Sequence, residues 1–255
     1  MRWLIALAVV ALTLPISLSA TPAHAGSPVP ITFGVSWDGP GNSLQDIVNS
    51  YVGSPGLINV HTDYVGAKPG DLDPWFWVGR IVPALLITEI AGNKDLNVLG
   101  WYKESGGKPV IDGVDDGIVF TGSMGSGQSV VVTFPGGGLT KFGFWLDPRG
   151  ARRASPGQSG LFFTNRFYND IGPGGTGALH APFDGDVQAL VFDVSKFKGP
   201  NTWLVCFEDI DAGLPITPCC SGTDNDFNDM VFQVTALGAT PTQPMSFGRL
   251  KALYR

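Results

Sequence analysis

The sequence has 255 residues, of which 16 are basic and 22 acidic, so its formal net charge is −6. With 44 % hydrophobic and only 15 % charged residues, the composition excludes an extended disordered chain, which needs low hydrophobicity and high charge. The acidic balance also argues against a nucleic-acid-binding protein, because binding to phosphates depends on Lys and Arg. The many turn formers (35 Gly, 20 Pro) and aromatic residues (16 Phe, 7 Trp, 5 Tyr) favour a loop-rich β protein.

The N-terminus has the pattern of a secretory signal peptide. Arg2 precedes an apolar run over residues 3–16, and Ala23-His24-Ala25 has the small-x-small pattern of a cleavage site. We expect residues 1–25 to be removed, which leaves 230 residues (255 − 25) for export to the extracellular space or the cell surface. The alternatives are an uncleaved membrane anchor and a buried helix.

One helix is predicted, over residues 42–51. Its apolar side chains follow the i, i+3, i+4, i+7 spacing of a helix that packs one face against a core. These are Leu44, Ile47, Val48 and Tyr51. Asn42 or Ser43 can cap its N-terminus, because a short polar side chain accepts a hydrogen bond from the first turn.

Most of the remaining chain alternates with period two between turn signals. The predicted strands cover residues 81–87, 129–134, 141–146, 160–163, 188–192, 202–207 and 230–234. The runs 129–134 and 141–146 flank a Pro-Gly-Gly-Gly turn, so we expect them to form an antiparallel pair. Several short strands between polar turns predict an all-β fold, a β-sandwich or jelly-roll-like domain with one short N-terminal helix.

We expect residues 26–255 to form a single secreted domain, because sandwiches of this size commonly fold as one unit. The alternative is a division near residues 105–118, where the chain is polar and rich in Gly. No segment after the signal peptide reaches the roughly 20 apolar residues of a membrane span. The longest apolar run, over residues 81–87, is interrupted by Pro83 and predicts a buried strand.

Three cysteines lie near the C-terminal end of the chain. Export permits a disulfide, and three pairings are open: Cys206 with Cys219, Cys206 with Cys220, or the adjacent pair Cys219-Cys220. A bridge from Cys206 would close a loop of about 13 residues and stabilise the fold by about 3 kcal/mol. A zinc site is not expected, because no second Cys pair and no nearby His complete a ligand set.

An acidic segment between two apolar strands, over residues 208–229, is the most informative part of the sequence. It carries six carboxylates and two carboxamides: Glu208, Asp209, Asp211, Asp224, Asp226, Asp229, Asn225 and Asn228. Carboxylates this close repel one another unless they are solvated or neutralised. A calcium ion, which takes six to eight oxygen ligands from carboxylates, amides and carbonyls, would neutralise them.

The spacing Asp224-x-Asp226-x-Asn228 is that of the opening of an EF-hand loop. The rest of that motif fails, because Asp229 stands where Gly is needed and Thr235 where a bidentate Glu belongs. We therefore predict a calcium cage built from loops between strands. The alternative is a turn in which Asn and Asp side chains bond to their own backbone.

The predicted ligands of this calcium ion are Asp209, Asp224, Asp226 and Asp229. A second acidic turn, over residues 112–117, carries only three carboxylates, so we favour a solvated turn there over another calcium site.

Two motifs resemble a known family. Phe207-Glu208-Asp209-Ile210 and Asp226-Phe227-Asn228-Asp229-Met230-Val231-Phe232 are similar to the paired FEDL and D-(Y/F)-N-D motifs of a bacterial secreted domain-of-unknown-function family. The resemblance covers roughly residues 140–235. Residues 44–47 and 89–93 resemble the front half of exported PEP-CTERM-type proteins. The resemblance implies a secreted or surface-associated β-sandwich with no established activity.

The chain departs from this family pattern in two places. Cys219 and Cys220 lie within the loop between the paired motifs, and no hydrophobic anchor follows them. The resemblance therefore does not extend to a membrane-sorting tail.

Enzyme signatures are missing from the sequence. There is no Gly-x-Ser-x-Gly elbow and no His-Glu-x-x-His pair, and His61 and His180 lie more than a hundred residues apart. We expect a non-enzymatic, calcium-stabilised module that binds an extracellular protein or glycan. The alternatives are a carbohydrate-binding protein that uses exposed aromatic rings at residues 75–77 and 101–102, and a glycosidase with paired carboxylates.

Overall fold

The structure is a computed structural model. It describes residues 33, 39–67, 75–78, 81–90, 95–134, 140–148, 160–169, 187–210 and 224–236. The expected signal peptide, Cys219, Cys220 and the region after residue 236 lie outside these residues, so the expectations for them stay predictions.

The strands form two antiparallel sheets, which confirms the all-β prediction, whereas the jelly-roll-like topology stays a prediction. Sheet I has the order β1 (Phe76–Val78), β6 (Thr140–Pro148), β3 (Asn97–Lys103), β4 (Asp116–Thr121), and β7 (Phe162–Phe163) also pairs with β6. Sheet II has the order β5 (Ser129–Thr133), β2 (Ile81–Glu89), β10 (Met230–Thr235), β9 (Thr202–Phe207), β8 (Ala189–Asp193).

The two sheets pack against each other through a core of aromatic and aliphatic side chains. The alternation of β10 explains which residues enter it: Phe232 and Val234 point into this core, whereas Val231 points to the other face of sheet II. The rings of Phe144 in sheet I and Phe232 in sheet II lie 4.9 Å apart, in an edge-on arrangement that aromatic pairs prefer. These contacts connect both sheets in one core.

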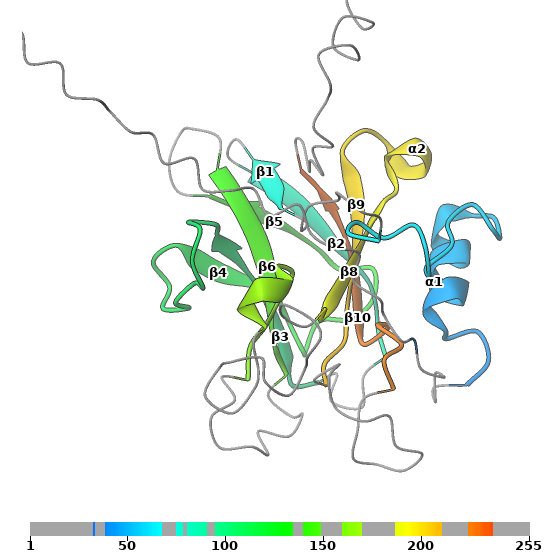
Figure 1. Ribbon diagram of the computed structural model, residues 1–255, viewed down its shortest axis with the longest axis horizontal. Coiled ribbons are helices and arrows are strands. Elements are labelled where there is room, and N and C mark those ends of the chain that lie inside the picture. Colours follow the sequence, from blue (N-terminus) through cyan, green and yellow to red (C-terminus); the bar gives the residue numbers. More distant parts are fainter. Residues whose placement is uncertain are drawn as a thin grey trace, which may run out of the picture.

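The predicted helix is present as α1 (Leu44–Val52) and forms a third layer on the outer face of sheet II (Figure 1). It begins at Ser43, whose Oγ accepts a hydrogen bond of 3.2 Å from the Asp46 N–H, and it ends at Gly53 in a left-handed conformation. Leu44 and Val48 pack, with others, against side chains of β8 and β9. None of the helices in the described part of the chain is long and apolar enough to cross a bilayer.

Two further short helical segments complete the described fold, α2 (Ser195–Lys198) and the 3₁₀ turn η1 (Arg166–Tyr168). Of the predicted strands, 202–207 has the bounds of β9, and 81–87, 188–192 and 230–234 correspond to β2, β8 and β10 with shifts of one or two residues. Three strands, β1, β3 and β4, were not predicted.

The expected antiparallel pair of the runs 129–134 and 141–146 is wrong. The first run, β5, pairs with β2 in sheet II, and the second, β6, pairs with β1, β3 and β7 in sheet I. The reason is that both runs carry inward-facing aromatic side chains. Phe134 and Phe142 meet ring to ring across the core, with centroids 4.7 Å apart, instead of lying on neighbouring strands.

A close approach of two strands in sheet I requires glycine at one position. A Cβ atom added to Gly100 of β3 would lie 2.1 Å from Cε2 of Trp145 and 2.5 Å from the carbonyl oxygen of Gly117. The indole of Trp145 lies across this glycine and donates a hydrogen bond of 3.1 Å to the carbonyl oxygen of Trp101. Because glycine has no Cβ atom, Gly100 leaves the space that the Trp145 ring fills.

Candidate metal centre

The candidate site begins where β9 ends. This strand lies between β10 and β8 and is buried on both faces, because the core covers one face and α1 with its surroundings covers the other. The chain continues directly into Glu208 and Asp209, which stay buried (1 % and 3 % exposed) although both carry a carboxylate. Apolar packing of β9 therefore places two acidic side chains inside the protein.

The segment that leads into β10 brings three further carboxylates to the same place (orange in Figure 1). The five acidic residues fall into two groups of three, and in each group one carboxylate oxygen per residue lies within 4.8 Å of the others. The groups are Glu208, Asp224 and Asp226, and Glu208, Asp209 and Asp229. We refer to these five residues as the carboxylate cluster.

Hydrogen bonds connect the end of β9 with the segment before β10 at the carboxylate cluster. The backbone N–H of Asp209 donates to Oδ2 of Asp229 (2.7 Å), and the backbone N–H of Phe227 donates to Oε2 of Glu208 (3.3 Å). Asn228 donates to both oxygens of Asp226, through its backbone N–H (3.2 Å) and its Nδ2 (2.7 Å). These bonds fix the carboxylates relative to one another.

The backbone before β10 adopts an uncommon conformation. Asn225 and Phe227 have φ angles of 51° and 56°, in the left-handed region that non-glycine residues rarely occupy. Phe227 is 1 % exposed, and its ring lies 5.8 Å from that of Phe33. The burial of this ring holds the segment in place, and the Nδ2 of Asn228 connects it to the carbonyl oxygen of Asn42 before α1 (2.8 Å).

The crowding of acidic groups perturbs Asp229 most clearly. Burial raises the pKa of its carboxyl well above the ordinary value, and the neighbouring carboxylates of Glu208 and Asp209 raise it further. The hydrogen bond from the Asp209 N–H acts in the opposite direction. Without a bound cation, this site therefore favours a proton on Asp229.

Two buried carboxamides border the carboxylate cluster. Asn97, the first residue of β3, donates through Nδ2 to Oδ2 of Asp209 (3.2 Å), while its Oδ1 makes no hydrogen bond within the described residues. Gln188 accepts a backbone hydrogen bond from the Glu208 N–H (3.1 Å), and neither atom of its own carboxamide has a hydrogen-bond partner in that part of the chain. Both residues are 0 % exposed.

Polar atoms buried without a hydrogen bond are costly, so each of these oxygens is a candidate ligand for a cation. The amide oxygens of Asn97 and Gln188 are suitable calcium ligands. The residues present therefore fit an oxygen-coordinated cation.

The structure divides the four predicted ligands between the two groups of three: Asp224 and Asp226 lie in one, and Asp209 and Asp229 lie in the other. Asp211 lies outside the described residues. Sequence reasoning noted Glu208 as an acidic neighbour but did not select it, although it belongs to both groups of three. It did not identify Asn97 or Gln188, because no sequence pattern connects them with the acidic segment over residues 208–229.

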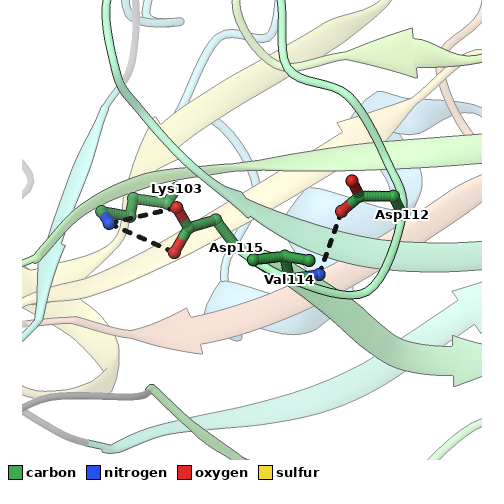
Figure 2. A network of polar contacts seen from close by, with 4 residues as sticks. All are labelled: Lys103, Asp112, Val114 and Asp115. Carbon is green, nitrogen blue, oxygen red and sulfur yellow. Dashed lines mark hydrogen bonds and ion pairs between the residues drawn. The ribbon is translucent and has the colours of Figure 1, made fainter.

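The second acidic turn uses its carboxylates locally. Figure 2 shows Oδ1 of Asp112 accepting the Val114 N–H (3.1 Å) and the Nζ of Lys103 bonded to both oxygens of Asp115 (3.1 and 3.2 Å). Oδ2 of Asp116 accepts the Asp112 N–H (2.9 Å). These are the side-chain-to-backbone bonds of an Asp-rich turn, and among the described residues no group of potential metal ligands includes them.

The aromatic residues considered for sugar binding do not form one exposed strip in the described part of the chain. Trp101 is buried and packs 4.3 Å from the ring of Phe134. Trp75 and Trp77 are half-buried, and the Nζ of Lys141 lies 3.2 Å from the centroid of the Trp75 ring. The Lys141 ammonium therefore occupies one face of that ring.

Cys206 is a free, buried thiol in β9, which contradicts the two pairings that involve it. Its side chain points to the face of sheet II that α1 covers, and burial raises the pKa of the thiol well above its ordinary value. A raised pKa keeps the group protonated and unreactive.

Comparisons of the chain with protein-family models, with curated proteins and with solved structures found no match.

Proposed function

We propose that the chain is an exported, non-enzymatic β-sandwich module that is stabilised by calcium and takes part in extracellular or cell-surface interactions, with a protein or glycan as the partner. One observation carries the calcium part of this proposal. Five carboxylates from the end of β9 and the approach to β10 converge within the protein, next to buried amide oxygens that make no hydrogen bond among the described residues.

The donor set favours calcium over other cations. Both groups of three consist only of Asp and Glu, and hard oxygen ligands suit calcium and magnesium, whereas zinc and copper prefer sites with His or Cys. Magnesium usually keeps several of its waters and is held by one or two carboxylates. A buried cluster with five carboxylates and two adjacent carboxamides fits the larger coordination number of calcium.

Burial supports a role in stability rather than in catalysis. Four of the five acidic side chains are at most 9 % exposed. A glycosidase needs a carboxylic acid and a carboxylate on either side of a bound sugar. Side chains this deeply buried are poorly placed to contact a sugar from solution.

Export supports calcium binding in turn. Extracellular calcium modules bind the ion with dissociation constants of about 10⁻⁴–10⁻³ M. The expected signal peptide over residues 1–25 sends the chain to a compartment where a site of that affinity is filled.

Thermal unfolding of the purified chain tests the calcium part. We expect added calcium to raise the melting temperature and EGTA to lower it, because an ion that binds only the folded state stabilises that state. Asp226→Asn should reduce the response. Asp115→Asn, in the exposed turn, is the matched control and should respond like the unchanged chain. Equal melting curves in calcium and EGTA would contradict the proposal.

The export part has a separate test. Expression in a bacterial host followed by N-terminal sequencing of the released protein should give Gly26 as the first residue. A chain retained in the cell with Met1 intact would contradict it.

A further inference from the structure

The five carboxylates of the carboxylate cluster carry more negative charge than one calcium ion neutralises. We propose that it binds two calcium ions, one in each group of three, and that the carboxylate of Glu208 bridges them. This inference rests on the proposed calcium function and specifies the number and arrangement of the ions.

The division into two sites follows from the composition of the two groups. Apart from Glu208 they share no residue: Asp224 and Asp226 complete one group, and Asp209 and Asp229 complete the other. A carboxylate has two oxygens, so Glu208 can offer a ligand to each ion. It is the only member of both groups found in the described chain.

Charge favours two ions over one. Five ionised carboxylates carry a formal charge of −5, so one divalent cation would leave −3 and two would leave −1. Negative charge that is concentrated in a buried site is unfavourable. A second ion therefore neutralises most of what the first leaves.

The two buried carboxamides next to the carboxylate cluster are independent evidence for a bound cation. The Asn97 carboxamide is fixed beside Asp209 by its Nδ2, so its Oδ1 lies close to the group formed by Glu208, Asp209 and Asp229. Gln188, the residue before β8, lies beside Glu208 and accepts the Glu208 N–H through its backbone carbonyl. Neither carboxamide oxygen has a hydrogen-bond partner among the described residues. Both are of the kind that calcium takes as ligands beside carboxylates.

The direct test is the number of calcium ions bound per chain, measured by isothermal titration calorimetry with calcium chloride and by native mass spectrometry. We expect two. Asp224→Asn and Asp229→Asn each remove a ligand from one group only, so each variant should retain one ion. Glu208→Gln weakens both sites, and it should bind neither ion at calcium concentrations that fill the unchanged chain.

Asp115→Asn is the control for calcium bound at exposed acidic side chains and should still bind two ions. One ion per unchanged chain would overturn the dinuclear arrangement but leave the proposed calcium function intact, whereas no bound ion would overturn both. Loss of both ions in Asp224→Asn would also contradict two separate sites. The stoichiometry of the unchanged chain decides the question even if a variant fails to fold.

Discussion

The free energy of unfolding is expected to rise with the logarithm of the free calcium concentration, and the slope should reflect the number of bound ions. An ion that binds only the folded state and is present well above its dissociation constant adds RT ln 10, or about 1.4 kcal/mol, for each tenfold rise in its concentration. Two ions, one for each group of carboxylates, would add about 2.7 kcal/mol. For a domain of this size, that corresponds to a rise in melting temperature of about 5–11 °C.

Urea denaturation in calcium-buffered solutions measures this slope. The free energy of unfolding should be determined at several free calcium concentrations, each ten times the previous one, with Asp115→Asn as a control that should give the same slope. A slope near 1.4 kcal/mol per tenfold step would mean one bound ion. A slope near zero would refute the explanation that a cation neutralises Glu208 and its neighbours.

Three further predictions concern other parts of the molecule. Gly100→Ala should lower the free energy of unfolding by about 3 kcal/mol, because the added methyl group meets the ring of Trp145. Gly107→Ala, where the added methyl group has open space, is the control and should change the free energy of unfolding by less than about 0.5 kcal/mol. Equal effects of the two variants in urea denaturation would contradict the close packing at Gly100. In calcium-free buffer the folded state holds the Asp229 proton more tightly than the unfolded chain, so its contribution to stability is complete below pH about 4 and is lost as the pH rises through the raised pKa. The stability of Asp229→Asn should fall less over that range, and parallel pH profiles would count against this. The Cys206 thiol should resist alkylation in the folded protein and react once urea unfolds it, as followed by peptide mass spectrometry; rapid labelling without denaturant would disprove its burial.

Local signals made part of the fold predictable from the sequence. The helix α1 depends on its own capping residue Ser43 and on a short apolar stripe, both visible in ten residues. The strand β9 has the predicted bounds because every residue from Thr202 to Phe207 is buried, and an uninterrupted apolar run indicates a central strand.

Strand pairing was less predictable because it depends on contacts between distant parts of the chain. The Pro-Gly turn after Phe134 favoured a hairpin, but the ring of this residue packs against Phe142 from the opposite sheet. The strand β3 was not predicted, because Asn97 at its start and Gly100 in its middle weaken the strand pattern. Their roles depend on neighbours, Asp209 and Trp145, that the local sequence does not reveal.

The part of the candidate site that was predictable consists of acidic residues that lie close together in the sequence. Asp224, Asp226 and Asp229 lie within six residues, and Asp209 follows a strand that pairs with the one after them. The membership of Glu208 in both groups was not predictable, because it depends on how the segment before β10 lies against the end of β9.

The long sequence separations at the carboxylate cluster have a kinetic consequence. The hydrogen bond from Asn97 to Asp209 joins residues 112 positions apart, and that from Asn228 to Asn42 joins residues 186 positions apart. The proposed coordination sphere is therefore expected to be complete only late in folding, once both sheets and the segment before α1 are in place. Interactions made after the folding barrier slow unfolding and leave the folding rate nearly unchanged. Calcium is thus expected to prolong the lifetime of the folded protein without helping it to form.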